Sequence, residues 1–268
     1  MLGIKLGLGV NSIVRLHISE LQALITSLFG ASEQGAIYIP RPVVNGEQAL
    51  FQDSAGTVPV TADGDPVGRM LDQSGNGNHA TQSISGSRPV YRTDGTLHWL
   101  EFDGVDDLFV TASTAITGIS SYTAASAFLT TSLGVQSIFD YDANPPRISQ
   151  LLRLQESKLS SIYFGDNVIN LLGTAVSEDT ALVVSIIAGS GFLTSRVNGL
   201  NSVSVSVTGN LSSTEQPLSV GGRLKASGIT SQHLQGNFYG GVVQETELSS
   251  PERVNLEGYL ANLAGITL

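Results

Sequence analysis

The sequence predicts an all-β protein: a two-sheet antiparallel sandwich with a short C-terminal helix and an N-terminal strand–helix arm. Two features of the composition point this way. Charged residues make up only 13% of the 268 residues, and 30 residues are glycine. This is typical of chains built from short strands and tight turns. Beyond residue 36 the helical period disappears, and about a dozen short apolar runs alternate with turn residues.

The sandwich is expected over residues 36–268. Its strands are separated by turn signals such as Asp94-Gly95 and Asn198-Gly199. Asn198-Gly199 indicates a two-residue hairpin, because both residues accept the positive φ angles of a type I′ turn. Ser249 and Glu252 form a capping box with a proline between them, which predicts a final helix that ends near Gly265.

Residues 1–35 are expected to form a separate arm that begins with a strand. Aliphatic residues alternate there with glycine and Lys5, so a strand would place five aliphatic side chains on one face. Glycine in a strand marks close approach of another backbone. The strand pairs either with a sheet edge of its own domain or with an edge of another chain. The aliphatic residues are Leu2, Ile4, Leu6, Leu8 and Val10.

A helix capped by Asn11 or Ser12 is expected to follow and to end at Gly30. Its apolar residues have heptad spacing over about two repeats, which is too short for an independent coiled coil. Two interpretations remain: the helix docks on its own domain, or it joins copies of the chain, with a trimer favoured. The arm is therefore interpreted as an attachment and oligomerisation device. The helical residues concerned are Val14, Ile18, Leu21, Ile25 and Leu28.

Charge and composition exclude several classes of protein. The net charge is −10 and no cluster of lysine and arginine occurs, which argues against nucleic-acid binding. The absence of cysteine excludes disulfides and thiolate metal sites. No run of 18 apolar residues occurs, so no membrane span is expected. The first residues lack the pattern of a secretory signal, so we expect synthesis in the cytoplasm without export by the ordinary route.

Several segments resemble a known family. Residues 70–82, 88–91 and 100–107 look like the opening of a laminin-G-like, concanavalin A-like jelly roll. Residues 238–245, 248–252 and 257–260 look like its last strand and final helix. Residues 50–61 and 66–70 are similar to a variant found in structural proteins of tailed bacteriophages, many of which begin with a Gly/Leu repeat like that of residues 2–10. The resemblance covers about a third of the chain.

The resemblance implies a non-enzymatic virion protein. The arm would anchor it to other virion proteins, and the jelly roll on the virion exterior would contact a host-surface glycan or another virion protein. It would be made in the host cytoplasm. A capsid decoration or head-fibre protein is the first alternative, and a polysaccharide-degrading tail enzyme is the second.

Catalytic residues are not expected. Glu101 and Asp103 have the i, i+2 spacing that places two carboxylates on one face of a strand, as in some glycoside hydrolases. Gly104, however, is expected to end that strand, and 6% aromatic content is low for a sugar cleft. The four histidines do not show metal-ligand spacing.

No cofactor is expected, with calcium as the one candidate. Oxygen-bearing side chains occupy alternate positions of a glycine-rich loop, as at the start of a calcium loop, and Asp106 or Asp107 could join them. The competing and favoured interpretation is a loop whose side chains hydrogen-bond its own backbone. The loop residues are Asp72, Ser74, Asn76 and Asn78.

Glycan contacts are expected from loops at one rim of the sandwich, at residues 140–150 and 221–234. These segments offer a ring for stacking beside hydrogen-bond donors. Their candidate residues are Tyr141, Arg147, Arg223 and His233. The alternative is that both segments are ordinary solvated hairpin loops.

Overall fold

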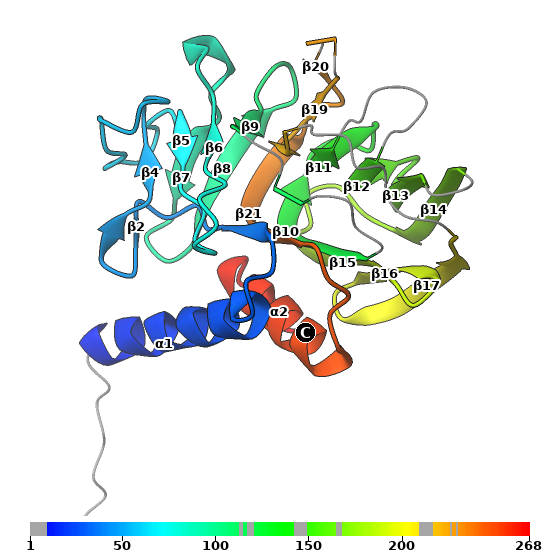
Figure 1. The fold of residues 1–268 in the computed structure, drawn as a ribbon. Helices are drawn as coiled ribbons and strands as arrows, with labels where there is room; N and C mark the ends of the chain where they lie inside the picture. The colour runs from blue at the N-terminus through cyan, green and yellow to red at the C-terminus, as the bar shows by residue number, and fades with distance from the viewer. Residues whose placement is uncertain are drawn as a thin grey trace, which may run out of the picture.

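The computed structural model describes residues 10–112, 115–116, 121–141, 149–164, 168–208, 217–225, 227–228 and 230–268. It is an antiparallel β-sandwich with two helices, α1 (Val10–Phe29) and α2 (Ser250–Leu263) (Figure 1). The predicted all-β sandwich is thereby confirmed, as are the capping box of α2 and the hairpin turn at Asn198-Gly199. Within the described ranges, no helix is both long and apolar enough to cross a membrane.

One sheet contains eight strands among the described residues. Its strand order is β17, β16, β15, β10, β21, β8, β7, and β1 pairs with the second half of β21. The strands are β1 (Gly35–Tyr38), β7 (Val90–Thr93), β8 (His98–Asp103), β10 (Tyr122–Thr130), β15 (Leu182–Gly189), β16 (Phe192–Val197), β17 (Leu200–Ser206) and β21 (Gln235–Gln244).

The opposing sheet contains nine strands in the described part of the chain, in the order β14, β13, β12, β11, β18, β9, β6, β5, β4. Two short hairpins, β2–β3 and β19–β20, and a 3₁₀ turn at Ser85–Ser87 complete the structure. The strands are β4 (Leu50–Phe51), β5 (Arg69–Met70), β6 (Ala80–Thr81), β9 (Phe109–Thr111), β11 (Gln136–Tyr141), β12 (Ser149–Gln155), β13 (Lys158–Phe164), β14 (Val168–Ala175) and β18 (Ser219–Val220). The hairpins are β2 (Val43–Val44) with β3 (Glu47–Gln48), and β19 (Arg223–Leu224) with β20 (Thr230–Ser231).

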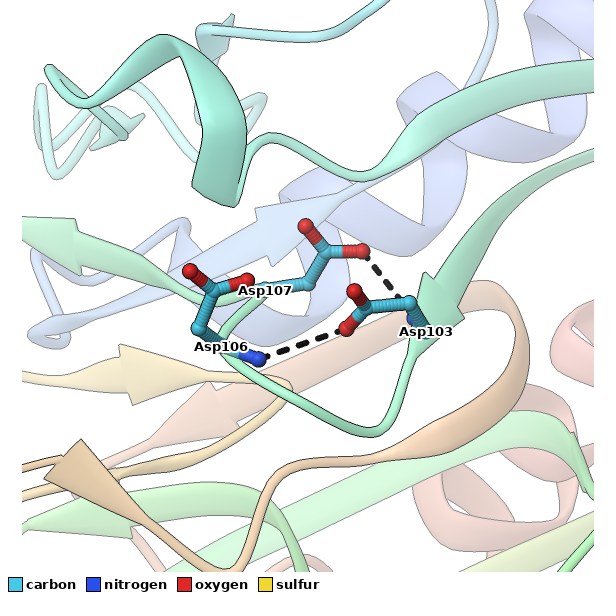
Figure 2. Close-up of side chains that lie close together, drawn as sticks. All are labelled: Asp103, Asp106 and Asp107. Atoms are coloured by element: carbon cyan, nitrogen blue, oxygen red, sulfur yellow. Dashed lines mark hydrogen bonds between the residues drawn. The ribbon is translucent and has the colours of Figure 1, made fainter.

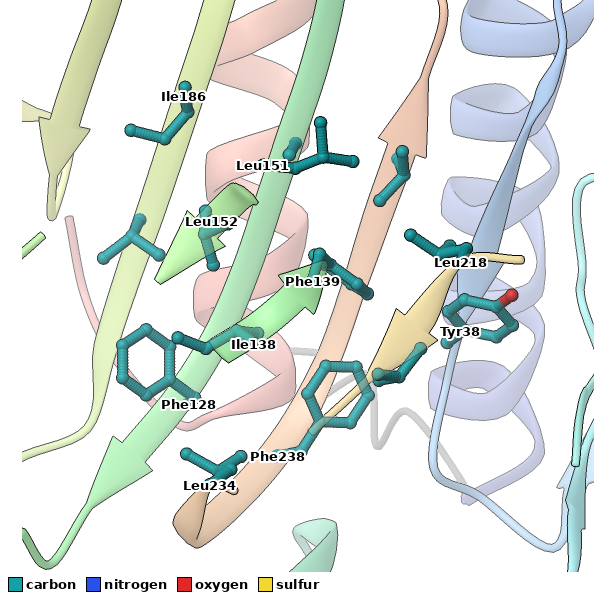
Figure 3. Packing of buried hydrophobic residues seen from close by; sticks show 14 of the residues in the cluster. Tyr38, Phe128, Ile138, Phe139, Leu151, Leu152, Ile186, Leu218, Leu234 and Phe238 are labelled. Carbon is teal, nitrogen blue, oxygen red and sulfur yellow. The ribbon is translucent and has the colours of Figure 1, made fainter. Parts of the chain in front are cut away.

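The main core lies between the two sheets. Aromatic rings meet edge to face there: the centroids of Phe139 and Phe238, from opposite sheets, are 6.1 Å apart with an interplanar angle of 90° (Figure 3). Phe102 makes a similar contact with Phe109 of the opposite sheet, at 6.2 Å and 80°. Such pairs contribute beyond the area they bury, so these rings fix how the two sheets pack on each other.

A second core lies on the other face of the eight-stranded sheet, beneath both helices. Leu256 and Leu260 of α2 pack there with Ala125, Val183 and other residues of the sheet. α2 thus covers the outer face of the eight-stranded sheet over β10, β15 and β21, and α1 packs against α2 (Figure 1). The nine-stranded sheet lies on the opposite side of the molecule.

The arm differs in part from its expected role. Residues 1–9 lie outside the described residues, and Val10 begins α1 instead of ending a strand. Leu21 and Leu28 are buried in the second core with exposed fractions of 3% and 0%. These two leucines are therefore core residues of this chain and not part of an exposed attachment surface. The heptad pattern arises, for this half of the helix, from docking on the chain's own domain.

A buried ion pair fastens α2 to the sheet. The Glu257 carboxylate, 2% exposed, lies 3.2 Å from Nε of Arg196 on β16. It also accepts a hydrogen bond of 2.6 Å from the Ser185 hydroxyl on β15. A buried charge that loses its partner is costly, so Glu257 and Arg196 depend on each other.

We expect Glu257→Gln to lower the free energy of unfolding by about 3 kcal/mol, because Arg196 is left in a site only 17% exposed without its counter-charge. The measurement is urea unfolding followed by circular dichroism. Glu101→Gln is the matched control, since it breaks the exposed Arg92–Glu101 pair and should cost about 0.5 kcal/mol or less. Equal losses in the two variants would contradict this assignment.

Candidate functional site

A row of polar residues crosses the outer face of the nine-stranded sheet. Each member alternates with core residues along its strand, as Asp140 does with Phe139 and Tyr141, so its side chain points away from the main core. The row runs over four adjacent strands, and its register pairs Asp140 with Ser219 and Arg153 with Ser160. We call it the polar row, and it consists of Ser137, Asp140, Arg153, Ser160 and Ser219.

The polar row is buried and internally hydrogen-bonded. Ser137 Oγ donates to Asp140 Oδ2 at 3.1 Å, and Arg153 Nε donates to Ser160 Oγ at 3.2 Å. Burial lowers the pKa of Arg153 to about 10; the Asp140 carboxylate opposes this shift and the Arg223 guanidinium adds to it. One carboxylate and two guanidinium groups therefore lie within electrostatic reach of one another on this face.

The segment 221–234 lies over this row, and its β19 strand packs against β11. It begins with a turn pressed onto the main core: Gly221 has φ +80°, and a Cβ there would come within 2.1 Å of the Phe102 ring. The polar row supports the turn, because Ser219 Oγ donates a 2.7 Å hydrogen bond to the Gly222 carbonyl.

Besides Lys225 and Ser231, this segment contains three half-buried polar residues: Arg223, Gln232 and His233. Gln232 has φ +55°, a left-handed conformation that is unfavourable for a residue with a side chain. Ser137 holds it there, because its amide donates to the Gln232 carbonyl at 2.8 Å, and its hydroxyl, which shares its one proton with Asp140 Oδ2, lies 3.1 Å from Gln232 Oε1. His233 Nδ1 lies 3.3 Å from the Asp107 carbonyl oxygen. We call these three residues the rim site.

Two of the four predicted glycan residues, Arg223 and His233, belong to the rim site. Tyr141 is a correction: it ends β11, is 5% exposed and donates a 2.6 Å hydrogen bond to the Ile116 carbonyl. Its ring lies on the core face of the sheet and therefore cannot stack on a sugar. Arg147 lies outside the described residues.

Gln232, Asp140 and Arg153 were missed by sequence reasoning. Arg153 follows two leucines and precedes another, so a lone charge within an apolar strand was the available signal. Asp140 was placed in a loop, whereas it lies within β11 with an exposed fraction of 0%. Nothing in the sequence marks Gln232, because its role depends on a left-handed backbone and on Ser137, which is 95 residues away.

An acidic loop, Asp103, Asp106 and Asp107, connects β8 to β9 beside the rim site. Carboxylate oxygens of the three residues lie within 4.8 Å of one another (Figure 2). Asp107 Oδ2 accepts from the Asp103 amide at 3.0 Å, and Asp103 Oδ1 accepts from the Val105 amide at 2.7 Å. Burial raises the pKa of Asp107 to about 7, and the neighbouring carboxylates add to the shift.

The residues weighed for catalysis have other partners. Glu101 and Asp103 do share the exposed face of β8, and the strand ends at Asp103 before Gly104, as expected. Glu101 accepts a 2.6 Å hydrogen bond from Nε of Arg92, while Asp103 caps the turn that follows. Of the two acids, Glu101 thus belongs to an ion pair with Arg92, and Asp103 stabilises the turn after β8.

The glycine-rich loop that was considered as a calcium site is hydrogen-bonded to its own backbone and to β1. The two carboxylate oxygens of Asp72 accept four hydrogen bonds of 2.8–3.0 Å, from the amides of Ile37, Ser74 and Asn78 and from the Ser74 hydroxyl. The Asn76 and Asn78 amide groups donate to the Gly35 carbonyl. Asp106 is grouped instead with Asp103 and Asp107, and its Oδ2 accepts from Ser87 at 2.8 Å. Calcium binding stays a prediction, and these three acids are a further place to test it.

The comparisons with known proteins concern the fold. No family model and no curated protein matches the sequence. Among solved structures, the chain is similar to domain 4 of AbnA, a GH43 extracellular arabinanase from Geobacillus stearothermophilus, in complex with arabinotriose. That similarity has a TM-score of 0.55 at 11% identity and covers 84% of this chain and 100% of that domain.

Two longer proteins are also similar to the chain. The binding domain of botulinum neurotoxin serotype D has a TM-score of 0.55 at 10% identity, covering 89% of this chain and 52% of the other. Trypanosoma rangeli sialidase has a TM-score of 0.51 at 12% identity, and the match spans 98% of this chain but 40% of the sialidase. Identities this low show the fold alone, which is an antiparallel β-sandwich.

The acidic loop gives the protein a specific dependence on pH. The pKa of Asp107 rises from 3.8 to about 7 on folding, so between about pH 4 and pH 7 this residue is ionised in the unfolded chain and protonated in the folded one. The free energy of unfolding therefore falls as the pH rises through this range. Asp107→Asn keeps an acceptor for the Asp103 amide but has no charge. We expect the variant to gain stability relative to the native protein as the pH rises from 4.5 to 8, by up to about 3 kcal/mol, measured as a rise in Tm in thermal scans at each pH.

The same thermal scans test calcium. A cation held by the three acids would favour the ionised form of Asp107, so 1 mM Ca²⁺, about the concentration at which weak sites fill, should raise the Tm of the native protein at pH 8 and not that of Asp107→Asn. A calcium effect that survives in Asp107→Asn and is lost in Asp72→Asn would move the site to the glycine-rich loop. No calcium effect in the native protein would contradict the calcium prediction.

Proposed function

We propose that this protein is a non-catalytic carbohydrate-binding β-sandwich, and that the rim site contacts the glycan. The observation that carries the proposal is the support of the rim site by the polar row. Gln232 is held in an unfavourable backbone conformation by Ser137, and Ser137 is in turn bonded to Asp140. Strain retained by a buried hydrogen-bond network is typical of positions that are pre-organised for a ligand.

The chemistry of the rim site suits sugar hydroxyl groups. The Arg223 guanidinium donates, the Gln232 amide group both donates and accepts, and the His233 ring does either according to its tautomer. All three are half-buried, so they lose little freedom when they bind. The similarity to domain 4 of the arabinanase, solved with arabinotriose, supports a saccharide as the ligand class.

The absence of catalysis forms part of the proposal. Glu101, the one acid on β8 that could act with Asp103, is engaged by Arg92. The acid with a pKa of about 7, Asp107, is 4% exposed and faces the Asp103 amide. A general acid needs to reach the glycosidic oxygen, and neither geometry offers this.

The test is binding to an immobilised panel of neutral and acidic oligosaccharides. We expect Arg223→Ala and Gln232→Gly to weaken binding by about tenfold each, a loss typical of one good polar contact. Gln232→Gly should at the same time stabilise the fold, because glycine accepts the positive φ. Arg253→Ala on α2 is the matched control and should bind normally.

Two results decide against this site. If the variants bind as well as the native protein, the polar row is a structural network that holds the β19–β20 hairpin and the glycan binds elsewhere. If the native protein turns over a polysaccharide and Glu101→Gln abolishes this, the hydrolase alternative replaces the binding proposal.

We further propose, from the sequence resemblance, that the chain is a bacteriophage virion protein of tail or fibre type that displays this domain to the host surface. Residues 50–61 and 66–70 support it, together with the Gly/Leu repeat before α1. Weak single-site affinity for a glycan would then be multiplied by several copies of the chain, a trimer being the arrangement we favour. The capsid-decoration role uses the same arm and differs in location.

Proteomic analysis and immunogold labelling of purified particles test the virion proposal. We expect the chain in the particles and the label on tails or fibres. A label on capsids, together with a higher melting temperature of particles that contain the protein, would establish decoration instead. Particles that lack the chain would contradict both roles.

A further inference from the structure

The chain contains three Asn-Gly pairs, at residues 45–46, 76–77 and 198–199. Such a pair can modify itself, because glycine has no side chain to shield its backbone nitrogen from the neighbouring asparagine. The glycine nitrogen loses its proton and attacks Cγ of the asparagine, and the amide group takes up a proton and leaves as ammonia. Water then opens the five-membered imide at either carbonyl, which yields aspartate or isoaspartate. The fold protects a pair when it holds the asparagine in place.

Asn198 is held by its neighbours in the eight-stranded sheet. Its backbone amide donates to the Val183 carbonyl at 2.7 Å, and its Oδ1 accepts from the Val183 amide at 2.9 Å. Gly199 is covered, since a Cβ there would lie 3.7 Å from Nη2 of Arg196 and 3.9 Å from the Glu257 carboxylate. The turn also closes the ladder between β16 and β17. The Asn198 side chain therefore reaches the Gly199 nitrogen only after several contacts break.

Asn76 is held through the group that would have to leave. Its Nδ2 donates to the Glu33 carbonyl at 3.0 Å and to the Gly35 carbonyl at 3.2 Å. Its backbone amide donates to Ser74 Oγ at 3.2 Å. These bonds tie the glycine-rich loop to the start of β1, so attack at this pair requires the loop to separate from β1.

Asn45 lacks restraints of this kind. Its side chain makes no hydrogen bond with the described residues, and both Asn45 and Gly46 are exposed. A Cβ on Gly46 would meet nothing within 4 Å, so water and base can approach the Gly46 nitrogen. The two residues have φ angles of +53° and +85°, as a type I′ turn requires.

The hairpin around Asn45 also opens readily. Ring closure places the glycine nitrogen beside Cβ of the asparagine, which a type I′ turn does not allow, so the turn has to open first. In the described part of the chain, β2 and β3 form a sheet of their own at the margin of the molecule (Figure 1). Its residue pairs are Val43 with Gln48 and Val44 with Glu47. An isolated hairpin is marginally stable in water, so it opens more often than strands within a large sheet.

We propose that Asn45 is a site of spontaneous deamidation in the folded protein, and that the fold protects Asn76 and Asn198. The change adds one negative charge to a net charge of −10. It is one-way because ammonia is lost, so the modified fraction records how long the folded chain has existed. Neither the rim site nor the polar row contains these residues, so this inference is independent of glycan binding.

The modification should loosen the hairpin. Isoaspartate carries the chain through its side-chain carbon and adds one atom to the backbone, which disrupts the two-residue turn. Val44, 7% exposed, packs in the second core and anchors β2 to the domain. Once the turn is lost, Val44 and Glu47 are no longer held opposite each other, and the segment 42–49 becomes more mobile.

The experiment is incubation of the full chain at mildly alkaline pH, followed by peptide mapping with mass spectrometry that separates aspartate from isoaspartate. Valine precedes both Asn45 and Asn198, so these two pairs are matched in local sequence. We expect Asn45 to convert about tenfold faster than Asn76 or Asn198, since breaking one ordinary hydrogen bond changes an equilibrium by up to about tenfold. In urea, where the chain is unfolded, the rates at Asn45 and Asn198 should become similar.

Asn45→Gly is the matched variant, because glycine keeps the type I′ turn and removes the reactive amide. It should not acquire the extra charge on isoelectric focusing. Hydrogen exchange in residues 42–49 should speed up in the converted native protein and stay unchanged in the variant incubated alongside.

Three results overturn the proposal. The first is that Asn45 converts no faster than Asn198 in the folded chain. The second is a faster rate at Asn45 that persists undiminished in urea, because local sequence and not the fold would then set it. The third is a converted hairpin that exchanges as slowly as the native one, which would contradict the loss of the turn.

Discussion

The sandwich depends on the pairing of its last strand. β21 is hydrogen-bonded to β8 along its first half, to β1 along its second half and to β10 over most of its length. This position requires close packing on both sides, because a Cβ on Gly241 would come within 2.6 Å of the Phe139 ring and one on Gly240 within 2.8 Å of Leu263. The two glycines let the sheet, the main core and α2 meet at one strand. The helices and the polar row lie on either side of the sandwich that is built around β21.

Features encoded by neighbouring residues were readable from the sequence. The Asn198-Gly199 hairpin, the Ser249–Glu252 capping box and the end of β8 before Gly104 each follow from backbone preferences of two to four residues. The fold class likewise followed from short apolar runs that alternate with turn residues. Strand order was a different matter, since β1 and β21 are about 200 residues apart and periodicity does not specify a partner at such a distance.

The candidate site was predictable only in part for the same reason. Arg223 and His233 stood out as polar residues in a glycine-rich segment, and both are half-buried in the structure. Tyr141 was assigned to a loop because aspartate and proline follow it, yet the strand continues through Asp140 and turns that ring inward. Arg153 and Asp140 acquire meaning once β11 and β12 are adjacent, which local sequence does not reveal.

The central place of β21 also has a consequence for synthesis on the ribosome. Translation at roughly 5–20 residues per second leaves β1, β8 and β10 without their shared neighbour for on the order of ten seconds or more. During that time their open edges are available to other nascent chains. The early strands β4, β5 and β6 are two residues each, and short edges of this kind recruit partners poorly. The eight-stranded sheet is therefore completed late in synthesis, when β21 emerges. The strands β4, β5 and β6, which are made early, are short.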